Sequence, residues 1–342
     1  MTDPLPTHAD RRTVAPARAA AALAAASALA LALAAPARAQ DGELAPFTYG
    51  LNWLPQAEHC GFFQALASGA YAEAGLDVEI VSGGPDVNVA LLVGAGELDA
   101  GMGSSFTTLN LVDQGVEAKT VAALFQKDPQ TLVAHAGQGV ETLADLSDRP
   151  IMVANFSRGE FWQFLKAEHG FTDDQLRPYS YNAAVFLSDP TAVQQGYVTE
   201  DGLFLGAELE EPPVILLLAD YGYENYATTI FATDATIEAR PDDLRAFVDA
   251  TIAGYETCLE TGAPEAMAMV MERNPDHSEE LWHYKLDVMR ERGLVAGGTA
   301  AEAGIGTMTA ERWQSFFDTM VEAGVYAADL PVEEAYTLEF VE

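Results

Sequence analysis

From Pro46 onward, short apolar runs alternate with stretches of helical periodicity, and this alternation restricts the fold more than any other feature of the chain. The first runs are FTYGLNWL, LDVEIVSGG, LDAGMG and AKTVAALFQK, and helices are predicted among them over 61–74 and 86–93. A second series comprises TLVAHA, PIMVA, LRPYSY, VQQGYVT and PPVILLLADYG, with a helix predicted over 158–168. Strands that alternate with helices at this spacing predict an α/β protein with parallel sheets.

The length of the chain predicts two lobes, because the roughly 300 residues after position 39 exceed one typical hydrophobic core. The chain would cross between the lobes near 125–129 and near 220–226, which assigns 40–127 plus 226–342 to lobe 1 and 128–225 to lobe 2. Two crossings permit hinge closure over a cleft between the lobes. The last third is predicted to be a helical extension on lobe 1. Its aromatic residues are predicted to be core: Trp282, Tyr284, Trp313, Phe316 and Phe317.

The N-terminal segment indicates export. Three arginines precede an Ala/Leu run over 19–35, and Ala37-Arg38-Ala39 follows it, which predicts a cleavable signal peptide over residues 1–39. The run is shorter than the roughly 20 residues of a membrane-spanning helix. The pair Arg11-Arg12 matches a twin-arginine signal only weakly, so the general secretory and twin-arginine routes both stay open. We therefore expect a periplasmic protein.

The charge of the chain is strongly negative. It holds 52 acidic against 17 basic residues, a formal net charge of −35, and such a surface repels nucleic acid and anionic lipid. Acidic residues are spread along the chain, which favours adaptation to salt over an ordinary acidic surface. Cys60 and Cys258 are the only cysteines, and their spacing leaves open whether they pair.

The known catalytic templates are missing from the sequence. It has no G-x-S-x-G, Walker, H-E-x-x-H or C-x-x-C motif, and its six histidines lack the spacing of a metal site. We therefore expect no catalysis, metal or cofactor. An exported enzyme that uses Glu58 and His59 as an acid/base pair is the less favoured alternative.

Polar and aromatic residues follow the predicted strands, at the sheet edge where open α/β sheets bind ligands. Trp53 could stack on a flat ring while Glu58 and His59 supply hydrogen bonds, although Trp53 as core and Glu58 as a helix-start carboxylate fit the pattern equally well. For serines at a helix start the alternative is simple capping, and for an arginine it is a surface ion pair. The remaining ligand-binding candidates are Gly84, Ser104, Ser105, Asn155, Arg158, Asn182, Gln195, Tyr197 and Tyr221.

Five segments together resemble the NMT1/THI5-like branch of ABC-transporter solute-binding proteins. They are NWLPQAEHCGFFQA, GLDVEIVSGGPDVNVALLVGAGELDAGMGSS, FQKDPQTLVAH, DRPIMVA and AVQQGYVT, within residues 46–240. The resemblance implies a two-lobed type II periplasmic-binding fold and the substrate-binding role of an ABC importer, with permease and ATPase subunits as partners. It also implies a small ligand, a thiamine-precursor pyrimidine in the best understood members, and riboflavin, sulfonates or nitrate in relatives. We expect a monomer.

Two positions depart from the family pattern. The element W-x-P-x-x-x-H-x-G resembles the family's pyrimidine-side signature and is carried by Trp53, Pro55, His59 and Gly61. However, Gln56 stands where Asn is common, and Asp201-Gly202 follows Glu200 where the family often has Pro. The cysteine-rich segment of the fungal synthases is missing. The favoured ligand is thus an aromatic heterocycle that resembles a thiamine-precursor pyrimidine; the alternative is riboflavin or an anion held by Ser104, Ser105 and Arg158.

Overall fold

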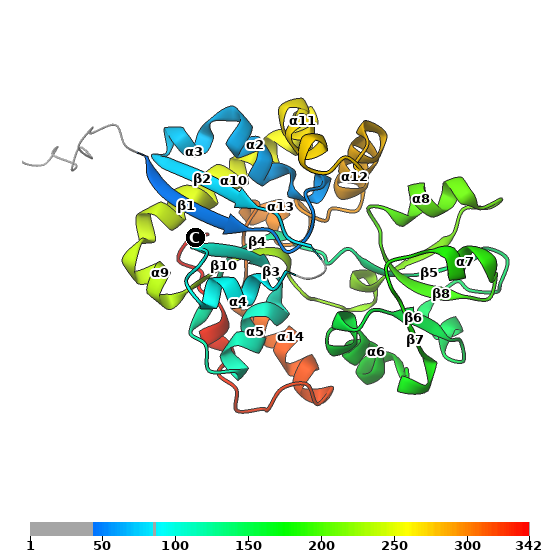
Figure 1. Cartoon of the computed structure of the whole chain (residues 1–342). Coiled ribbons are helices and arrows are strands. Elements are labelled where there is room, and N and C mark those ends of the chain that lie inside the picture. The colour runs from blue at the N-terminus through cyan, green and yellow to red at the C-terminus, as the bar shows by residue number, and fades with distance from the viewer. Residues whose placement is uncertain (1–43, 85–86, 342) are drawn as a thin grey trace, which may run out of the picture. The chain divides into compact units, whose positions relative to one another are not determined.

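The computed structural model describes residues 44–84 and 87–341, and Figure 1 shows their arrangement. The predicted signal peptide lies outside these residues. The described strands form two five-stranded sheets, which belong to the same compact unit of the chain. The first sheet has the order β2-β1-β3-β10-β4. Its strands are β1 (Ala45–Gly50), β2 (Leu76–Val81), β3 (Ala100–Gly103), β4 (Ala118–Phe125) and β10 (Ala227–Thr233).

The second sheet has the order β7-β6-β8-β5-β9. Its strands are β5 (Gln130–Ala134), β6 (Ile151–Val153), β7 (Leu176–Pro178), β8 (Val193–Tyr197) and β9 (Val214–Leu217). The chain passes between the sheets twice, from β4 to β5 and from β9 to β10. Together the two sheets confirm the predicted α/β class and the type II periplasmic-binding fold.

Both sheets are mixed, so the prediction of purely parallel sheets is wrong. β10 runs antiparallel to β3 and β4, and β5 runs antiparallel to β8 and β9. The cause is the connection between the sheets. β5 and β10 are the first strands after each crossing, so each begins at the side of its sheet that faces the crossing and runs away from it. β1, β3, β6 and β8 run in the opposite direction and end at that side.

The predicted helix over 61–74 is two helices, because the chain turns at Gly69. The helix α2 (Cys60–Ser68) ends there and α3 (Ala70–Glu73) begins, and Gly69 has a φ of 81°, a conformation that glycine adopts without steric cost. A 3-10 turn, η1 (Ala57–His59), precedes α2. The other helices on this sheet that precede the first crossing are α4 (Val89–Gly94) and α5 (Ser105–Asp113).

Short helices and turns surround the second sheet. The helix predicted over 158–168 begins as the 3-10 turn η3 (Phe156–Gly159) and continues as α6 (Phe161–His169). The others are η2 (Leu143–Leu146), η4 (Asp173–Gln175), α7 (Ala184–Ser188), α8 (Asp201–Glu208) and η5 (Leu218–Tyr221).

The last third is helical, as predicted, and Trp282, Trp313, Phe316 and Phe317 are buried, whereas Tyr284 is only half-buried. The longest helix, α10, packs on α2 (Figure 1). No helix within 44–84 and 87–341 combines the length and apolar character needed to cross a membrane. The C-terminal helices are α9 (Asp234–Ala239), α10 (Pro241–Thr261), α11 (Pro264–Arg273), α12 (Glu279–Glu291), α13 (Ala300–Ala303), α14 (Ala310–Glu322) and the turn η6 (Val332–Ala335).

A line of aromatic rings joins the two sheets through α14. Phe316 of α14 packs edge-on against Phe106 of α5, with 5.0 Å between ring centroids. On its other side it meets Tyr223, which precedes β10 and in turn contacts Phe164 of α6 at 5.1 Å. These four residues belong to one buried cluster. The C-terminal region therefore covers the first sheet through α10 and also reaches the second sheet through α14.

Candidate functional site

Two aromatic rings from different sheets meet beyond the carboxyl ends of their strands. Trp53, which follows β1, lies 5.4 Å from Tyr181, which follows β7, measured between ring centroids. Trp53 is half-buried and Tyr181 is 53% exposed, so both rings keep surface that a ligand could cover. We call these two residues the aromatic pair.

The loops that carry the aromatic pair are held in place locally. The N–H of Gly83 donates to the carbonyl of Trp53 at 3.1 Å, and a Cβ at Gly83 would lie 2.1 Å from the carbonyl oxygen of Leu51, so only glycine lets these two loops approach. Tyr181 has a φ of 57°, which is rare for a bulky residue and occurs often at ligand sites. The side chain of Asn182 accepts a hydrogen bond from the N–H of Ala184 at 2.8 Å, and this stabilises the turn after Tyr181.

The carboxyl groups of Glu160 and Asp128 affect the pKa values of the tyrosines in this region. Burial first, and then the neighbouring Asp128 carboxylate, raise the pKa of Glu160 to about 8. Burial also raises the pKa of Asp128, to about 6. The charge of Glu160 acts on Tyr181 and on Tyr197, where burial first and then Asp128, Glu58 and Glu160 raise the phenol pKa. Among the described residues, none hydrogen-bonds the Glu160 carboxyl, which leaves a protonated acid free to meet a ligand at neutral pH.

The two crossings between the sheets are fastened to each other at Asp128. Asn225 of the second crossing donates from Nδ2 to Asp128 of the first at 2.6 Å. Its Oδ1 accepts from the N–H of Ser105 at 3.1 Å, and the Ser105 hydroxyl accepts from the N–H of Tyr226 at 3.0 Å. Ser105 is thus engaged within the protein. The half-buried Ser104 donates its N–H to the Thr107 hydroxyl at the start of α5.

A buried ion pair lies between η1, α12 and the loop before α8. The Lys285 ammonium of α12 lies 3.1 Å from the Glu58 carboxylate and 3.1 Å from that of Glu200. The Thr199 hydroxyl donates to Glu58 at 2.5 Å. Burial opposes the charge of Glu58, but Lys285 and Thr199 outweigh it and lower the Glu58 pKa. Since Thr199 and Glu200 follow β8 of the second sheet, these bonds join the two lobes.

One glycine permits this contact between lobes. A Cβ at Gly202, in the first turn of α8, would lie 2.1 Å from the hydroxyl oxygen of Tyr284 in α12. Gly202 thus lets the backbone of α8 approach the Tyr284 side chain of α12. We call this approach the α8–α12 contact.

His59 is fully buried beside this ion pair. Burial lowers its pKa to about 4, so the ring is neutral at pH 7, and neither ring nitrogen has a hydrogen-bond partner in the described residues. His277, which lies near the same charges, has its pKa lowered to about 4 mainly by burial. Glu58 and His59 are 2% and 0% exposed. Solvent therefore does not reach the pair that the enzyme hypothesis requires.

The other predicted residues lie in different environments. Gln195 is buried and accepts a hydrogen bond from the N–H of Ala154 at 2.6 Å, which ties β8 to the end of β6. Arg158 is half-buried, its Nε has no partner among the described residues, and its charge helps to lower the pKa of Asp173. Asn155 is exposed, and Gly84 is buried with open space at its Cβ position. The backbone carbonyl of Tyr221 accepts a hydrogen bond from His169 in the tautomer that carries the proton on Nε2.

The structure thus brings Trp53 beside Tyr181, which the sequence analysis missed. Glu160, whose charge acts on Tyr181 and Tyr197, and Asp128, whose charge acts on Tyr197, were also missed. Their one signal in the sequence is position, since each follows a strand of the two sheets. Lys285 was missed as well. It lies among the apolar buried residues of α12, and a lysine in such a position indicates a buried acidic partner elsewhere in the chain.

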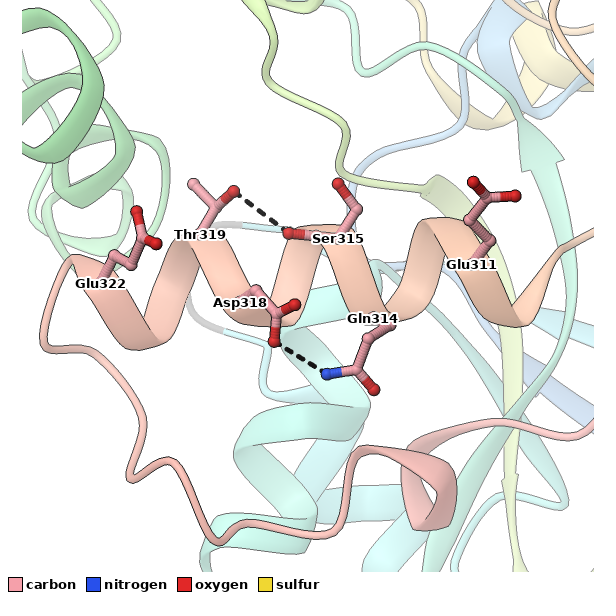
Figure 2. Close-up of a pocket in the computed structure, with 6 residues that line it drawn as sticks. All are labelled: Glu311, Gln314, Ser315, Asp318, Thr319 and Glu322. Carbon is pink, nitrogen blue, oxygen red and sulfur yellow. Dashed lines mark hydrogen bonds between the residues drawn. The ribbon is translucent and has the colours of Figure 1, made fainter.

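The hollows found on the surface are separate from this region. One of about 440 Å³ lies along α14 (Figure 2) and is lined by Glu311, Gln314, Ser315, Asp318, Thr319 and Glu322. All six belong to one helix, and Gln314 and Asp318 hydrogen-bond each other. A second, of about 360 Å³, includes Lys119 at the start of β4, away from the carboxyl ends. The described residues hold no cluster of three His, Cys, Asp or Glu side chains fit for a metal ion.

Comparison with known proteins identifies the family. The family described as NMT1/THI5 like matches residues 56–265, which is more than half of the chain. The chain belongs to the NMT1/THI5-like family. The predicted resemblance is therefore confirmed.

Among curated proteins similar to this chain, the riboflavin-binding protein RibY of Chloroflexus aurantiacus is 25% identical over 90% of this chain and 89% of its own. A 4-amino-5-hydroxymethyl-2-methylpyrimidine phosphate synthase of Saccharomyces cerevisiae, THI11, is 27% identical over 48% of this chain and 46% of its own. The periplasmic aliphatic sulphonate binding protein SsuA of Escherichia coli has the same fold, with a TM-score of 0.62 and 13% identity over 85% of this chain and 92% of its own.

Proposed function

We propose that this protein is a periplasmic solute-binding protein that holds an uncharged, flat heterocycle between its two sheets. The observation that carries the proposal is the aromatic pair, in which Trp53 and Tyr181 approach from different sheets to 5.4 Å. Both side chains follow the carboxyl ends of their strands, where open α/β sheets bind ligands. A ring inserted between them would gain contact area from both lobes at once, and this would couple binding to closure.

The charges around the aromatic pair favour a ligand that donates hydrogen bonds. Glu160 and Asp128 are carboxyl groups without a neighbouring cation strong enough to lower their pKa values, which are raised to about 8 and about 6. An anion placed here would be repelled when either group ionises. Arg158, the cation that a sulfonate or nitrate would need, acts on Asp173 instead. This argues against the anionic alternative.

Riboflavin is the first candidate, because its isoalloxazine ring is flat, uncharged and carries an imide N–H that a carboxyl group can accept. The full-length similarity to a riboflavin-binding protein supports this choice, whereas the similarity to a pyrimidine phosphate synthase covers about half of either chain. A thiamine-precursor pyrimidine, which the sequence alone favours, becomes the second candidate. Its amino group would suit the Glu160 carboxyl group.

The test is a titration with three ligands. Riboflavin fluorescence should be quenched to saturation at one ligand per protein, because the ring stacks on an aromatic side chain. Calorimetry with an aminopyrimidine and with an alkanesulfonate gives the comparison, and the sulfonate should show no binding at low salt. Saturable sulfonate binding together with unchanged riboflavin fluorescence would refute the proposal.

We further propose that the protein returns its ligand unchanged, acts as a monomer and passes the ligand to the permease and ATPase subunits of an ABC importer. The complete burial of His59 and the ion pairing of Glu58 support a non-enzymatic role. Mass spectrometry of riboflavin recovered after long incubation should find only riboflavin. A converted product that disappears in a Glu58→Gln variant would contradict this part.

A further inference from the structure

The helices α2 and α10 of the first lobe approach each other closely. A Cβ at Gly254 of α10 would lie 2.1 Å from the carbonyl oxygen of Gly61 in α2, and a Cβ at Gly61 would lie 2.0 Å from the ring of Tyr255. The backbone of α10 at Gly254 therefore touches that of α2 at Gly61, and the Tyr255 ring packs against Gly61. Figure 1 shows both helices on the same side of the first sheet.

The two cysteines of the chain flank this crossing. Cys60 precedes Gly61, and Cys258 lies one helical turn after Gly254, on the same face of α10. Both are free thiols, fully buried at 0% exposure in the same hydrophobic cluster, and the neighbouring Cys258 thiol contributes, after burial, to raising the pKa of the Cys60 thiol. The crossing thus places side by side two thiols that are 198 residues apart in the sequence.

The backbone near each cysteine is held by a hydrogen bond from a neighbouring helix. The Tyr255 hydroxyl of α10 donates to the carbonyl of Glu58 at 2.6 Å, two residues before Cys60. Arg290 of α12 donates to the carbonyl of Cys258 at 3.2 Å. Because these bonds hold both backbones, the thiols have little freedom to move apart, and a covalent bond between them requires little rearrangement.

We propose that Cys60 and Cys258 are joined by a disulfide bond that forms while the protein folds outside the cytoplasm. The oxidant is a disulfide-bearing molecule, either a protein disulfide or oxidised glutathione. One cysteine thiolate attacks it and forms a mixed disulfide, and the second thiolate then displaces the oxidant as a thiol. The two cysteines lose two protons and two electrons in total, and the oxidant's S–S bond is reduced to two thiols.

The timing follows from the burial of the thiols. Burial, together with the neighbouring Cys258 thiol, raises the pKa of the Cys60 thiol, so the reactive thiolate is scarce in the folded protein. Solvent-borne oxidants do not reach either sulfur. The bond must therefore form before α2 is fully packed on α10, and it serves as a permanent link instead of a redox switch. The inference does not depend on which ligand the protein binds.

The test is to unfold the full chain and refold it in a glutathione redox buffer, then to count thiols with a maleimide under denaturing conditions. Refolded protein should be lighter by two hydrogen atoms and take up no maleimide, and reduction should restore two reactive thiols. The melting temperature of oxidised protein should exceed that of reduced protein by on the order of 5 to 10 °C, because the bond closes a long loop in the unfolded chain.

The matched controls are Cys60→Ala, Cys258→Ala and the double variant. In each of the three, the melting temperature should no longer respond to reductant, since either cysteine alone cannot form the bond. Two free thiols or only glutathione adducts in the refolded wild type would overturn the proposal. So would an oxidised form that melts below the reduced form, because a bond native to this fold must not strain it.

Discussion

Two tryptophans show at the residue scale how the surroundings of an indole ring determine its role. Trp53 is half-buried and meets one ring, that of Tyr181, across the two sheets. Trp313 of α14 is fully buried and stacks on Tyr336 with ring planes 7° apart. The sequence shows both as aromatic residues in apolar runs, and only the packing separates a ring available to a ligand from a ring that holds the core.

The first prediction is that Trp53→Ala weakens ligand binding while the fold survives. Loss of one stacked ring costs about 1 to 3 kcal/mol, a decrease in riboflavin affinity of roughly 5- to 150-fold. The melting temperature of the ligand-free protein should change little. Trp313→Ala is the matched control and should lower stability by about 3 to 5 kcal/mol through the cavity that it leaves. Equal destabilisation by both variants would show that Trp53 is structural.

The second prediction concerns Glu160, whose pKa burial raises to about 8. The folded protein holds this proton, whereas an unfolded glutamate loses it near pH 4.3. This contribution to stability is therefore complete below about pH 4.3 and is lost as the pH rises through 8. Glu160→Gln should melt close to the wild type at pH 3.5, where the unfolded glutamate also keeps its proton, and above it at pH 8.5.

The measurement is a series of thermal melts across this pH range. The control is Glu168→Gln, an exposed position of α6, the helix that begins directly after Glu160. Asp128 and Asp201, with pKa values raised to about 6 and about 7 chiefly by burial, are present in all three proteins, so the comparison isolates Glu160. A constant difference between Glu160→Gln and wild type at every pH would contradict the prediction.

At the scale of elements, the α8–α12 contact joins a helix that follows the second sheet to a helix of the C-terminal region. The third prediction is that Gly202→Ala lowers stability by about 1 to 3 kcal/mol and weakens ligand binding, because its Cβ would lie 2.1 Å from the Tyr284 hydroxyl oxygen. Gly206→Ala in the same helix, where a Cβ meets nothing within 4 Å, should be neutral or stabilise by roughly 0.5 kcal/mol.

A second substitution distinguishes the steric clash at Gly202→Ala from the effect of alanine on helix propensity. The next atom of Tyr284, the ring carbon that carries the hydroxyl, lies 3.4 Å from the Gly202 Cβ position. Adding Tyr284→Phe to Gly202→Ala removes the clashing oxygen and should recover most of the lost stability and affinity. If the double variant is no better than Gly202→Ala alone, the α8–α12 contact does not limit closure.

The elements themselves were predictable, but their directions and partners were not. Apolar runs marked the strands because buried strands are apolar wherever they lie. The antiparallel direction of β10 depends on where the chain re-enters the first sheet, which no local pattern records. Lys285 could not be matched to Glu58, 227 residues away, because an ion pair between distant segments of the chain has no fixed sequence spacing. Tyr181 was missed since its role comes from a backbone turn and not from its residue type.

At the scale of the whole molecule, the negative charge should make stability depend on salt. The fourth prediction is that the melting temperature rises with sodium chloride from about 0.1 M to 1 M, as the screening length falls from about 10 Å to 3 Å and repulsion among 52 acidic residues weakens. The Glu58–Lys285 pair is buried and should be little affected. An uncharged osmolyte at matched osmolality is the control. A flat melting temperature in salt, or an equal rise in the osmolyte, would exclude salt adaptation.

The aromatic line through Phe106, Phe316, Tyr223 and Phe164 has a consequence for how such a protein can be divided. Because α14 closes the core of both sheets, neither lobe is a self-sufficient module. A chimera that exchanges only residues 128–225 with a relative would inherit a foreign Phe164 and Tyr223 against the native Phe316, and its interior would be mismatched. Ligand preference in this family should therefore be transplanted together with α14, or by changing single residues at the strand ends.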